Sequence, residues 1–251
     1  MGKRKRERGR GLKLRKLGNI GGTSWHSTAL YYDHINRAVA QRMGGLHSAR
    51  LCIESLDLAP IAEMEHAGDW DGVAKETLDA ARRLEASGAE AVIITSNTGH
   101  KVFDAVAANI DIPMLHIGDA LADRLVADRQ TRVALLGTRF TMTEGHVRDR
   151  LERRGIQLAP IDAVWTRELD RIIFDELAAG RVTRDSQRKL KTLITELSKQ
   201  KVQAVVLGCT ELVLAVEVRA NVLPVYDSTV IHARAAVEWM LVQEEQARAA
   251  A

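Results

Sequence analysis

Continuous apolar runs alternate along the chain with amphipathic stretches of helical period. The runs "AVIITSN" (residues 91–97) and "RVALLG" (residues 132–137) contain no polar alternation, as in strands that are buried on both faces of a parallel sheet. The stretch "AKETLDAARRLEASGAE" (residues 74–90) repeats its apolar residues at helical spacing, with Gly88 as its stop signal. This alternation of strands and helices predicts an α/β fold with mostly parallel sheets.

The second half of the chain repeats elements of the first half. Thr23 and Thr138 follow matching strands and lie 115 positions apart, and Ser96 and Cys209 end matching strands and lie 113 positions apart. Such a near-constant offset indicates an internal duplication. We therefore expect two pseudo-symmetric lobes, each a mostly parallel sheet flanked by helices. We expect the active site in the cleft between them, because ligands bind at the carboxyl ends of parallel strands.

The duplication and the charge pattern predict where the parts of the chain begin and end. Residues 1–16 contain nine Lys or Arg and one Glu, and we expect them to be a disordered basic tail. Residues 17–115 together with 223–251 are expected to form the first lobe. Residues 116–222 are expected to form the second.

Composition excludes several classes of function. The 251 residues are 46% hydrophobic and 27% charged, which is typical of a globular protein. The net charge of +3 comes from the tail, which carries +8, so the rest of the chain carries −5. We therefore expect no nucleic-acid partner for the folded part of the protein. We expect a cytoplasmic protein without a membrane partner, because there is no long apolar run, no secretory signal and no disulfide framework.

Cys209 is the first candidate for chemistry. It follows a strand and lies among polar residues, at a point where backbone N–H groups of a helix start would stabilise a thiolate. A buried structural cysteine and a Cys-His-Asp hydrolase that uses His100 or His232 are alternatives. No His, Cys and Glu spacing indicates a metal. A third possibility is a pair of acid/base groups, Cys209 and Ser96, on opposite faces of one substrate carbon.

Several patches of the sequence together resemble the aspartate/glutamate racemase superfamily of cofactor-independent amino-acid racemases. The resemblance runs from about Leu17 to Leu241 and rests on "IGGTSWHSTALYY", "SNTGHK", "IPMLHIGDA", "LLGTRFTM", "IIFDEL", "LGCTEL" and "LPVYDSTVIHA". It implies two pseudo-symmetric α/β lobes and racemisation of a small-molecule amino acid. It also implies that no pyridoxal phosphate or other cofactor takes part, and that the protein is a homodimer.

The resemblance also implies roles for individual residues. Cys209 and Ser96 would be the catalytic pair, each on one face of the substrate. The residues implied to hold the substrate's α-carboxylate and amino group are Asn97, Thr98, Thr138 and Thr210.

Ser96 departs from the family pattern, which usually has cysteine at this position and in some members threonine. A serine hydroxyl is a much poorer base than a thiolate at neutral pH unless a neighbouring group activates it. We therefore expect the two faces to be chemically unequal. If Ser96 cannot exchange protons, the protein would be a catalytically weak amino-acid-binding protein.

Three further positions bear on the substrate. Glu65 and Glu168 align with positions where the family carries glutamine and lysine, respectively. Two carboxylates there would favour a basic amino acid such as lysine or arginine through charge-assisted hydrogen bonds. The alternatives are an aspartate/glutamate racemase and solvent-exposed glutamates without a role. Thr23 either contacts the substrate or caps the helix that follows, and we favour the cap.

Overall fold

A computed structural model describes residues 14–218 and 221–241, which form two compact units. The described part of unit 1 consists of residues 14–93, 105–115 and 233–241, and that of unit 2 of residues 94–104, 116–218 and 221–232. Most of the predicted basic tail, residues 1–13, lies outside the described residues.

These units differ from the predicted lobes in two segments. Residues 94–104 and residues 223–232 were expected in the first lobe, and both pack with unit 2. Long-range hydrogen bonds hold both segments in unit 2, because the side chains of Asn97 and Thr98 are bonded to Ser228 and Thr138 of the same unit.

Unit 1 contains a four-stranded sheet in the order β2-β1-β3-β4. The pairs β1–β2 and β3–β4 run parallel. Its elements are β1 (Leu17–Gly21), α1 (Trp25–Met43), β2 (Leu51–Ser55), α2 (Leu58–Ala67), α3 (Trp70–Ala86), β3 (Ala91–Ile94) and β4 (Met114–Leu115). Two helices, α4 (Phe103–Ala107) and α10 (Ser228–Leu241), begin in unit 2 and end in unit 1.

Unit 2 contains a second four-stranded sheet, in the order β6-β5-β7-β8, and all of its pairs run parallel. Its strands are β5 (Arg132–Gly137), β6 (Gln157–Leu158), β7 (Ala204–Gly208) and β8 (Val225–Asp227). Its α-helices are α5 (Ile117–Ala127), α6 (Arg139–Thr143), α7 (Gly145–Glu152), α8 (Ala163–Arg171) and α9 (Arg184–Lys199). Two 3₁₀ helices, η1 (Thr98–Val102) and η3 (Thr210–Leu214), and a π-helix, η2 (Ile172–Leu177), complete it.

The strands of both sheets have the same spatial order. When the strands of each sheet are numbered by their order in the sequence, the second lies at one edge and is followed by the first, the third and the fourth. The duplication inferred from the spacing of residues therefore has a counterpart in the topology. The predicted α/β fold with two parallel sheets flanked by helices is confirmed.

Capping residues explain where α3 and α9, the helices that precede β3 and β7, begin. Asp69 caps α3 by accepting from the N–H of Gly72, and Thr183 caps α9 by accepting from the N–H of Ser186. The chain leaves α3 through Gly88, whose φ of +84° is left-handed and suits glycine.

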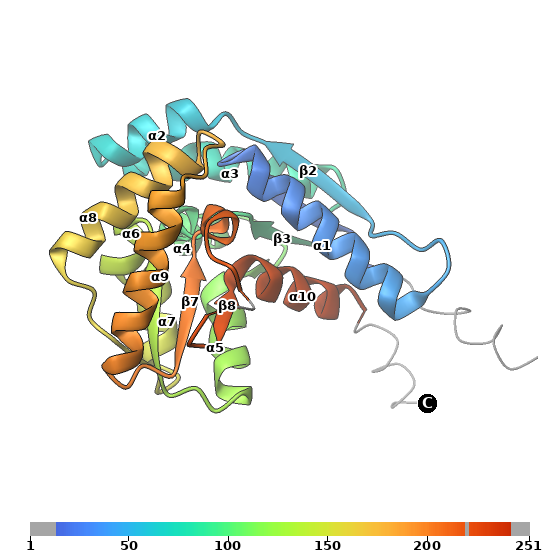
Figure 1. Cartoon of the computed structure of the whole chain (residues 1–251). Helices are drawn as coiled ribbons and strands as arrows, with labels where there is room; N and C mark the ends of the chain where they lie inside the picture. The colour runs from blue at the N-terminus through green and yellow to red at the C-terminus, as the bar shows by residue number, and fades with distance from the viewer. Residues whose placement is uncertain (1–13, 219–220, 242–251) are drawn as a thin grey trace, which may run out of the picture. The chain divides into compact units, whose positions relative to one another are not determined.

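The core of unit 2 lies on both faces of its sheet. One cluster joins α8, η2 and α9 to β5 and β7, and the other joins α5 and α7 to the same two strands. Figure 1 shows α9 running alongside β7. In unit 1, buried residues of α1 and α10 pack against β1 and β3. The continuous apolar sequences of the strands had predicted this burial on both faces of a sheet, and unit 2 shows it.

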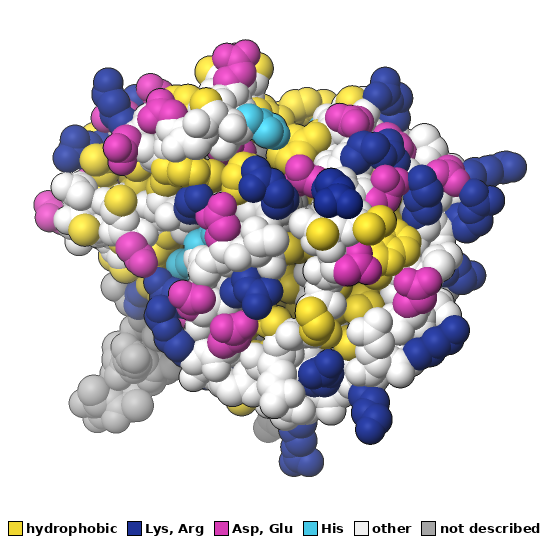
Figure 2. All heavy atoms as spheres, turned by 90° about the vertical axis from the view of Figure 1, so that its left-hand side faces the viewer, with side chains coloured by type: hydrophobic (Ala, Val, Ile, Leu, Met, Phe, Trp, Pro, Cys, Tyr) yellow, Lys and Arg dark blue, Asp and Glu magenta, His cyan; other side chains and the backbone are white. Residues whose placement is uncertain are grey.

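The surface carries charges of both signs. Figure 2 shows Lys and Arg side chains interspersed with Asp and Glu on the face that it presents, not gathered into one basic area. Many of them are paired, as in the contacts of Arg150 with Asp104 and Asp119. Among the described residues, no helix combines the length and the apolar character needed to cross a membrane.

Candidate active site

Polar residues follow the carboxyl ends of three neighbouring strands in unit 2. Thr138 follows β5, Cys209 follows β7 and Ser228 follows β8. β5 and β7 approach each other closely at this edge, because a Cβ atom on Gly137 would lie 2.7 Å from the carbonyl oxygen of Gly208. The glycines before Thr138 and Cys209 thus permit the close approach of the two strand ends.

The turn after β3 crosses this edge of the sheet. Asn97 Nδ2 donates to Ser228 Oγ over 3.0 Å, and the hydroxyls of Thr98 and Thr138 are hydrogen-bonded over 3.0 Å. One end of the turn is therefore held at β8 and the other at β5. Since β7 lies between β8 and β5, the turn passes the strand end that carries Cys209.

This arrangement gathers most of the predicted site residues. Neighbouring strands lie about 4.8 Å apart, so the groups at the ends of β5, β7 and β8 fall within the span of one small ligand. The residues that unit 2 brings to this edge are Ser96, Asn97, Thr98, Thr138, Cys209 and Thr210.

Cys209 is paired with a carboxylate that the sequence had not singled out for a role. Its thiol donates to Glu211 Oε2 over 3.0 Å, and the hydroxyl of Thr210 donates to the same oxygen over 2.7 Å. Burial, followed by the negative charge of Glu211, raises the pKa of the Cys209 thiol well above its ordinary value. The backbone N–H groups of Glu211 and Leu212 act in the opposite direction and are outweighed.

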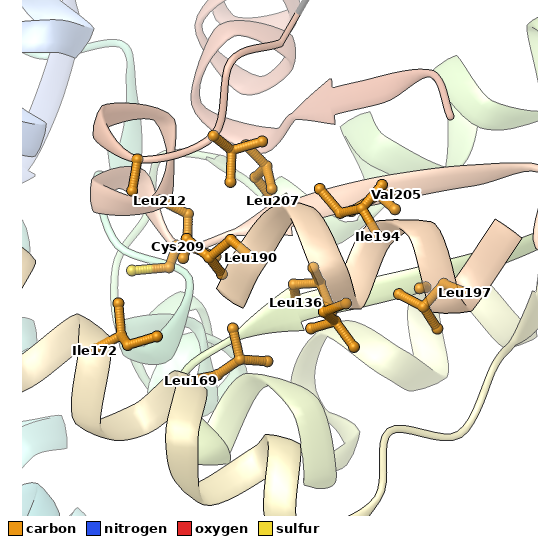
Figure 3. Packing of buried hydrophobic residues seen from close by; sticks show 14 of the residues in the cluster. Leu136, Leu169, Ile172, Leu190, Ile194, Leu197, Val205, Leu207, Cys209 and Leu212 are labelled. Atoms are coloured by element: carbon orange, nitrogen blue, oxygen red, sulfur yellow. The ribbon is translucent and has the colours of Figure 1, made fainter. Parts of the chain in front are cut away.

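The expectation of a stabilised thiolate is therefore wrong, because burial and the charge of Glu211 favour the thiol. Cys209 is only 7% exposed and belongs to the apolar cluster of unit 2. Figure 3 shows it among Leu190, Leu212 and Ile172. An apolar surrounding disfavours the charged form, so the resting side chain is a thiol whose proton points to Glu211.

Ser96 has a different environment. Its side chain is half-buried, and its Oγ accepts from the N–H of Gly99 over 3.2 Å. Its carbonyl oxygen accepts from His100 Nδ1 over 2.6 Å. Within the described residues, no carboxylate or imidazole is hydrogen-bonded to Ser96 Oγ, so nothing corresponds to the Glu211 that serves Cys209.

Two buried polar atoms near this edge have no hydrogen-bond partner within the described residues. They are Asn97 Oδ1 and Thr229 Oγ1, and Thr229 is 1% exposed. Buried polar groups are usually satisfied, so both atoms are suited to bind a polar ligand. Ser228, Thr229 and Glu211 were not predicted as site residues, although they lie in the stretches "LPVYDSTVIHA" and "LGCTEL", on which the family resemblance partly rests.

Glu168 is held in an ion-pair network. Its Oε1 lies 2.8 Å from Arg171 Nη2 and 2.9 Å from Lys189 Nζ. The hydrogen bond from Arg171, and then that from Lys189, lower the pKa of Glu168 to about 2. Arg171 also pairs with Glu176, and Lys189 with Asp185. The carboxylate of Glu168 is therefore ionised and already balanced by two cations.

Glu65 and Thr23 belong to unit 1, and their contact with substrate stays a prediction. Glu65 is buried, so the alternative of a solvent-exposed side chain is wrong. The interpretation of Thr23 as a helix cap is also wrong, because Ser24 caps α1 by accepting from the N–H of Ser27 over 3.4 Å. Thr23 Oγ1 is buried and has no hydrogen-bond partner among the described residues.

Comparison with known proteins places the chain in a family. The model of the Asp/Glu/hydantoin racemase family matches residues 20–236. The chain belongs to this family. An Asp/Glu racemase candidate from Yersinia pestis shares 39% identity, and the match covers 91% of this chain and 100% of that one, with a TM-score of 0.84. The resemblance seen in the sequence is therefore confirmed.

Other members of the Asp/Glu/hydantoin racemase family are similar over most of their length. PH1733, an aspartate racemase homologue from Pyrococcus horikoshii OT3, shares 32% identity over 90% of this chain and 99% of that one, with a TM-score of 0.78. The broad specificity amino-acid racemase RacX of Bacillus subtilis is 23% identical over 70% of this chain and 76% of its own length. The buried Cys209–Glu211 pair makes the end of β7 the candidate place for chemistry in unit 2.

Proposed function

We propose that this protein racemises a free amino acid without pyridoxal phosphate, by removing the α-proton on one face and returning a proton on the other. The observation that carries the proposal is the buried Cys209–Glu211 pair at the end of β7. It supplies a thiol together with a group that can accept the thiol proton. The family of the chain supports the same reaction class.

The substrate's backbone groups match the polar atoms at this edge. Asn97 Oδ1 is a buried acceptor that has no partner among the described residues, as a substrate ammonium requires. The Thr98 and Thr138 hydroxyls are hydrogen-bonded to each other, which leaves one O–H of this pair to donate to the α-carboxylate, and the Thr229 hydroxyl is a second donor. An ammonium bound near Cys209 favours the thiolate, because a nearby positive charge lowers the pKa of a thiol.

Glu211 then acts as the proton acceptor for Cys209. The thiol proton moves to Glu211 Oε2 and leaves a thiolate. The thiolate removes the α-proton of the enantiomer whose hydrogen faces it, and becomes a thiol again. The carbanion takes a proton on its other face from the Ser96 hydroxyl, or from a water that this hydroxyl orients. The proton held by Glu211 returns to solvent, and solvent gives one proton back to the Ser96 oxygen or to the water that donated. Every group is then in its starting protonation state.

The two directions are unequal in this mechanism. The direction that starts with Cys209 uses a thiolate as its base. The direction that starts on the other face must use Ser96, whose Oγ already accepts the Gly99 N–H and has no basic neighbour among its described contacts. The two enantiomers have equal free energy, so kcat/KM is the same in both directions. We therefore expect the inequality in kcat, which should be larger for the direction that starts at Cys209 and be matched by a larger KM, since an unactivated hydroxyl is a poor base.

Whether the substrate has an acidic or a basic side chain is argued from Glu168, Glu65 and the relatives of the chain. Glu168 is balanced by Arg171 and Lys189, which weakens its predicted role in selecting a basic amino acid. Two relatives are described as an Asp/Glu racemase candidate and an aspartate racemase homologue, which favours aspartate or glutamate as substrate. Glu65, which stands where the family pattern has glutamine, keeps lysine or arginine as the second candidate.

Deuterium exchange tests these proposals directly. The protein is incubated in D₂O with each enantiomer of aspartate, glutamate, lysine and arginine, without pyridoxal phosphate, and α-deuterium and chirality are followed. We expect racemisation that Cys209→Ala abolishes and that Cys52→Ala, in β2 of unit 1, retains. Binding without deuterium uptake would instead identify a catalytically weak amino-acid-binding protein. Uptake by lysine or arginine alone would assign the basic class.

A further inference from the structure

His100 is buried in unit 2 and uses both of its ring nitrogens. Nδ1 lies 2.6 Å from the carbonyl oxygen of Ser96, and Nε2 lies 3.1 Å from the backbone nitrogen of Ile117. A carbonyl oxygen can only accept, and a backbone N–H can only donate. These two partners therefore assign the proton to Nδ1 and the lone pair to Nε2.

The surroundings of His100 keep this ring neutral. It is 2% exposed, and the rings of Phe103, His116 and His232 lie within 4.6 to 5.7 Å of it, measured between ring centroids. Burial, and then the neighbouring His116, place the pKa of His100 well below its ordinary value. A protonated ring would also turn Nε2 into a donor facing the Ile117 N–H. A neutral ring whose two nitrogens are both hydrogen-bonded within unit 2 is suited to hold the neighbouring backbone in place.

The two hydrogen bonds of His100 join two pieces of chain that carry the site. Ser96 lies in the turn after β3, and Ile117 is the first residue of α5. The Ser96 carbonyl is fixed by His100, while its Oγ accepts from Gly99. A side chain takes its direction from its own backbone, so the bond to the carbonyl fixes where the Ser96 hydroxyl lies. Cys209 has its own partner, Glu211, and has no hydrogen bond to His100 among those described.

We propose that His100 is a positioning residue for the Ser96 face of the active site, and for that face alone. Its Nδ1–H holds the Ser96 carbonyl and thereby orients the hydroxyl toward the substrate carbon. This role rests on the proposed racemase function. It predicts that a loss of the bond slows proton transfer on the Ser96 face and leaves the Cys209 face nearly unchanged.

Two variants separate the two hydrogen bonds of the ring. In His100→Asn, the amide nitrogen replaces Nδ1 as donor to the Ser96 carbonyl, and the bond from Ile117 is lost. In His100→Gln, the amide oxygen replaces Nε2 as acceptor from Ile117, and the bond to Ser96 is lost. Both variants introduce a polar amide into the same buried space, so each controls for the other. His66→Gln is an external control, because this exposed histidine is bonded to the Ala62 carbonyl in unit 1.

The test measures the initial rate of α-hydrogen exchange in D₂O from each pure enantiomer, with any amino acid on which the wild type acts. We expect His100→Gln to slow exchange of the enantiomer that faces Ser96 by roughly tenfold, as for the loss of one ordinary hydrogen bond. Exchange of the other enantiomer should stay within about twofold. His100→Asn should keep the wild-type ratio of the two rates, and His66→Gln should change neither.

The other outcomes overturn the proposal in distinguishable ways. If the two rates fall together in His100→Gln, the ring only maintains the fold, and a lowered unfolding temperature would accompany that result. Unchanged rates in His100→Gln would show that the bond does not orient Ser96. A wild-type protein that exchanges no α-hydrogen with any amino acid overturns the racemase function itself, and the positioning role with it.

Discussion

The thiol of Cys209 donates a hydrogen bond to Glu211 Oε2 over 3.0 Å, in a part of unit 2 from which water is largely excluded. A buried thiol beside a carboxylate resists ionisation, and the carboxylate is at the same time the acceptor to which the proton can move. One pair of residues therefore sets both the resting state of the candidate catalytic thiol and its route to the thiolate.

Replacing Glu211 by glutamine should lower the pKa of Cys209 and lower the rate of racemisation. The pKa falls because the negative charge that disfavours a thiolate is removed, and the rate falls because no carboxylate accepts the thiol proton. Ultraviolet absorbance of the thiolate as pH rises, with Cys209→Ala subtracted, measures the first effect. Glu217→Gln, an exposed glutamate of the same unit, is the control. An unchanged or raised titration midpoint contradicts this account.

Ser96→Cys should bring the two directions of the reaction closer together. A thiol ionises near pH 8.5 in model peptides, whereas an unactivated hydroxyl does not ionise near neutral pH, so the weak face gains a usable base. Values of kcat from the two pure enantiomers, each at saturating concentration, give the comparison. We expect the kcat of the slower direction to gain at least about tenfold. Equal wild-type kcat values in both directions would refute the asymmetry before the variant is made.

Asn97→Ala should raise KM more than Ser228→Ala does. Asn97 Oδ1 is proposed to accept from the substrate ammonium, and a hydrogen bond to a charged group contributes about 1.5–3 kcal/mol, or roughly 10–150-fold in affinity. Ser228 only holds Asn97 Nδ2, so its loss should cost a few-fold. Initial-rate kinetics of both variants decide this. A larger effect in Ser228→Ala would point to direct substrate contact by Ser228.

Glu168→Gln should change stability in a pH-dependent manner and change substrate preference little. The pKa of Glu168 is lowered to about 2 in the folded protein, so its ion pairs stabilise the fold above pH 4.5 and are lost as pH falls from about 4.5 to 2. Its partner Arg171 is substantially exposed, so we expect less than about 1 kcal/mol at neutral pH.

Urea unfolding of Glu168→Gln and the wild type at neutral pH and near pH 3 measures this contribution. The difference between them should shrink at the lower pH. Glu63→Gln, an exposed residue of α2, provides the control. A large loss of activity toward one side-chain class in Glu168→Gln would instead restore its predicted role in selectivity.

Elements with strong local signals were predictable from the sequence. The apolar runs that became β3 and β5, the strand that ends before Cys209 and the amphipathic helix α3 lie where the pattern placed them, to within a few residues. Their burial is periodic and their caps are local, so a short window of sequence contains the information. The choice of Thr23 as the cap of α1 failed because the neighbouring Ser24 has the same capping chemistry, and a pattern cannot rank adjacent hydroxyls.

The partners of site residues were not predictable in the same way. Asn97 and Ser228 are 131 positions apart, and only folding shows that they are hydrogen-bonded. The balance of Glu168 by Lys189 likewise depends on two helices that pack side by side. The lowered pKa expected for Cys209 failed because sequence shows the N–H groups of a helix start but not the burial that opposes them.

By itself, the sequence determined the alternation of strands and helices, the duplication, the family resemblance and the position of Ser96 and Cys209 at matching strand ends. These depend on periodicity, on short motifs and on the spacing of motifs along the chain. All three can be determined without knowing which residues meet in space. Only the tertiary structure decided that Glu211 faces Cys209, that His100 holds Ser96 and that Glu168 is already paired. Burial and hydrogen bonding arise from residues brought together in space, and they set the protonation state of a group.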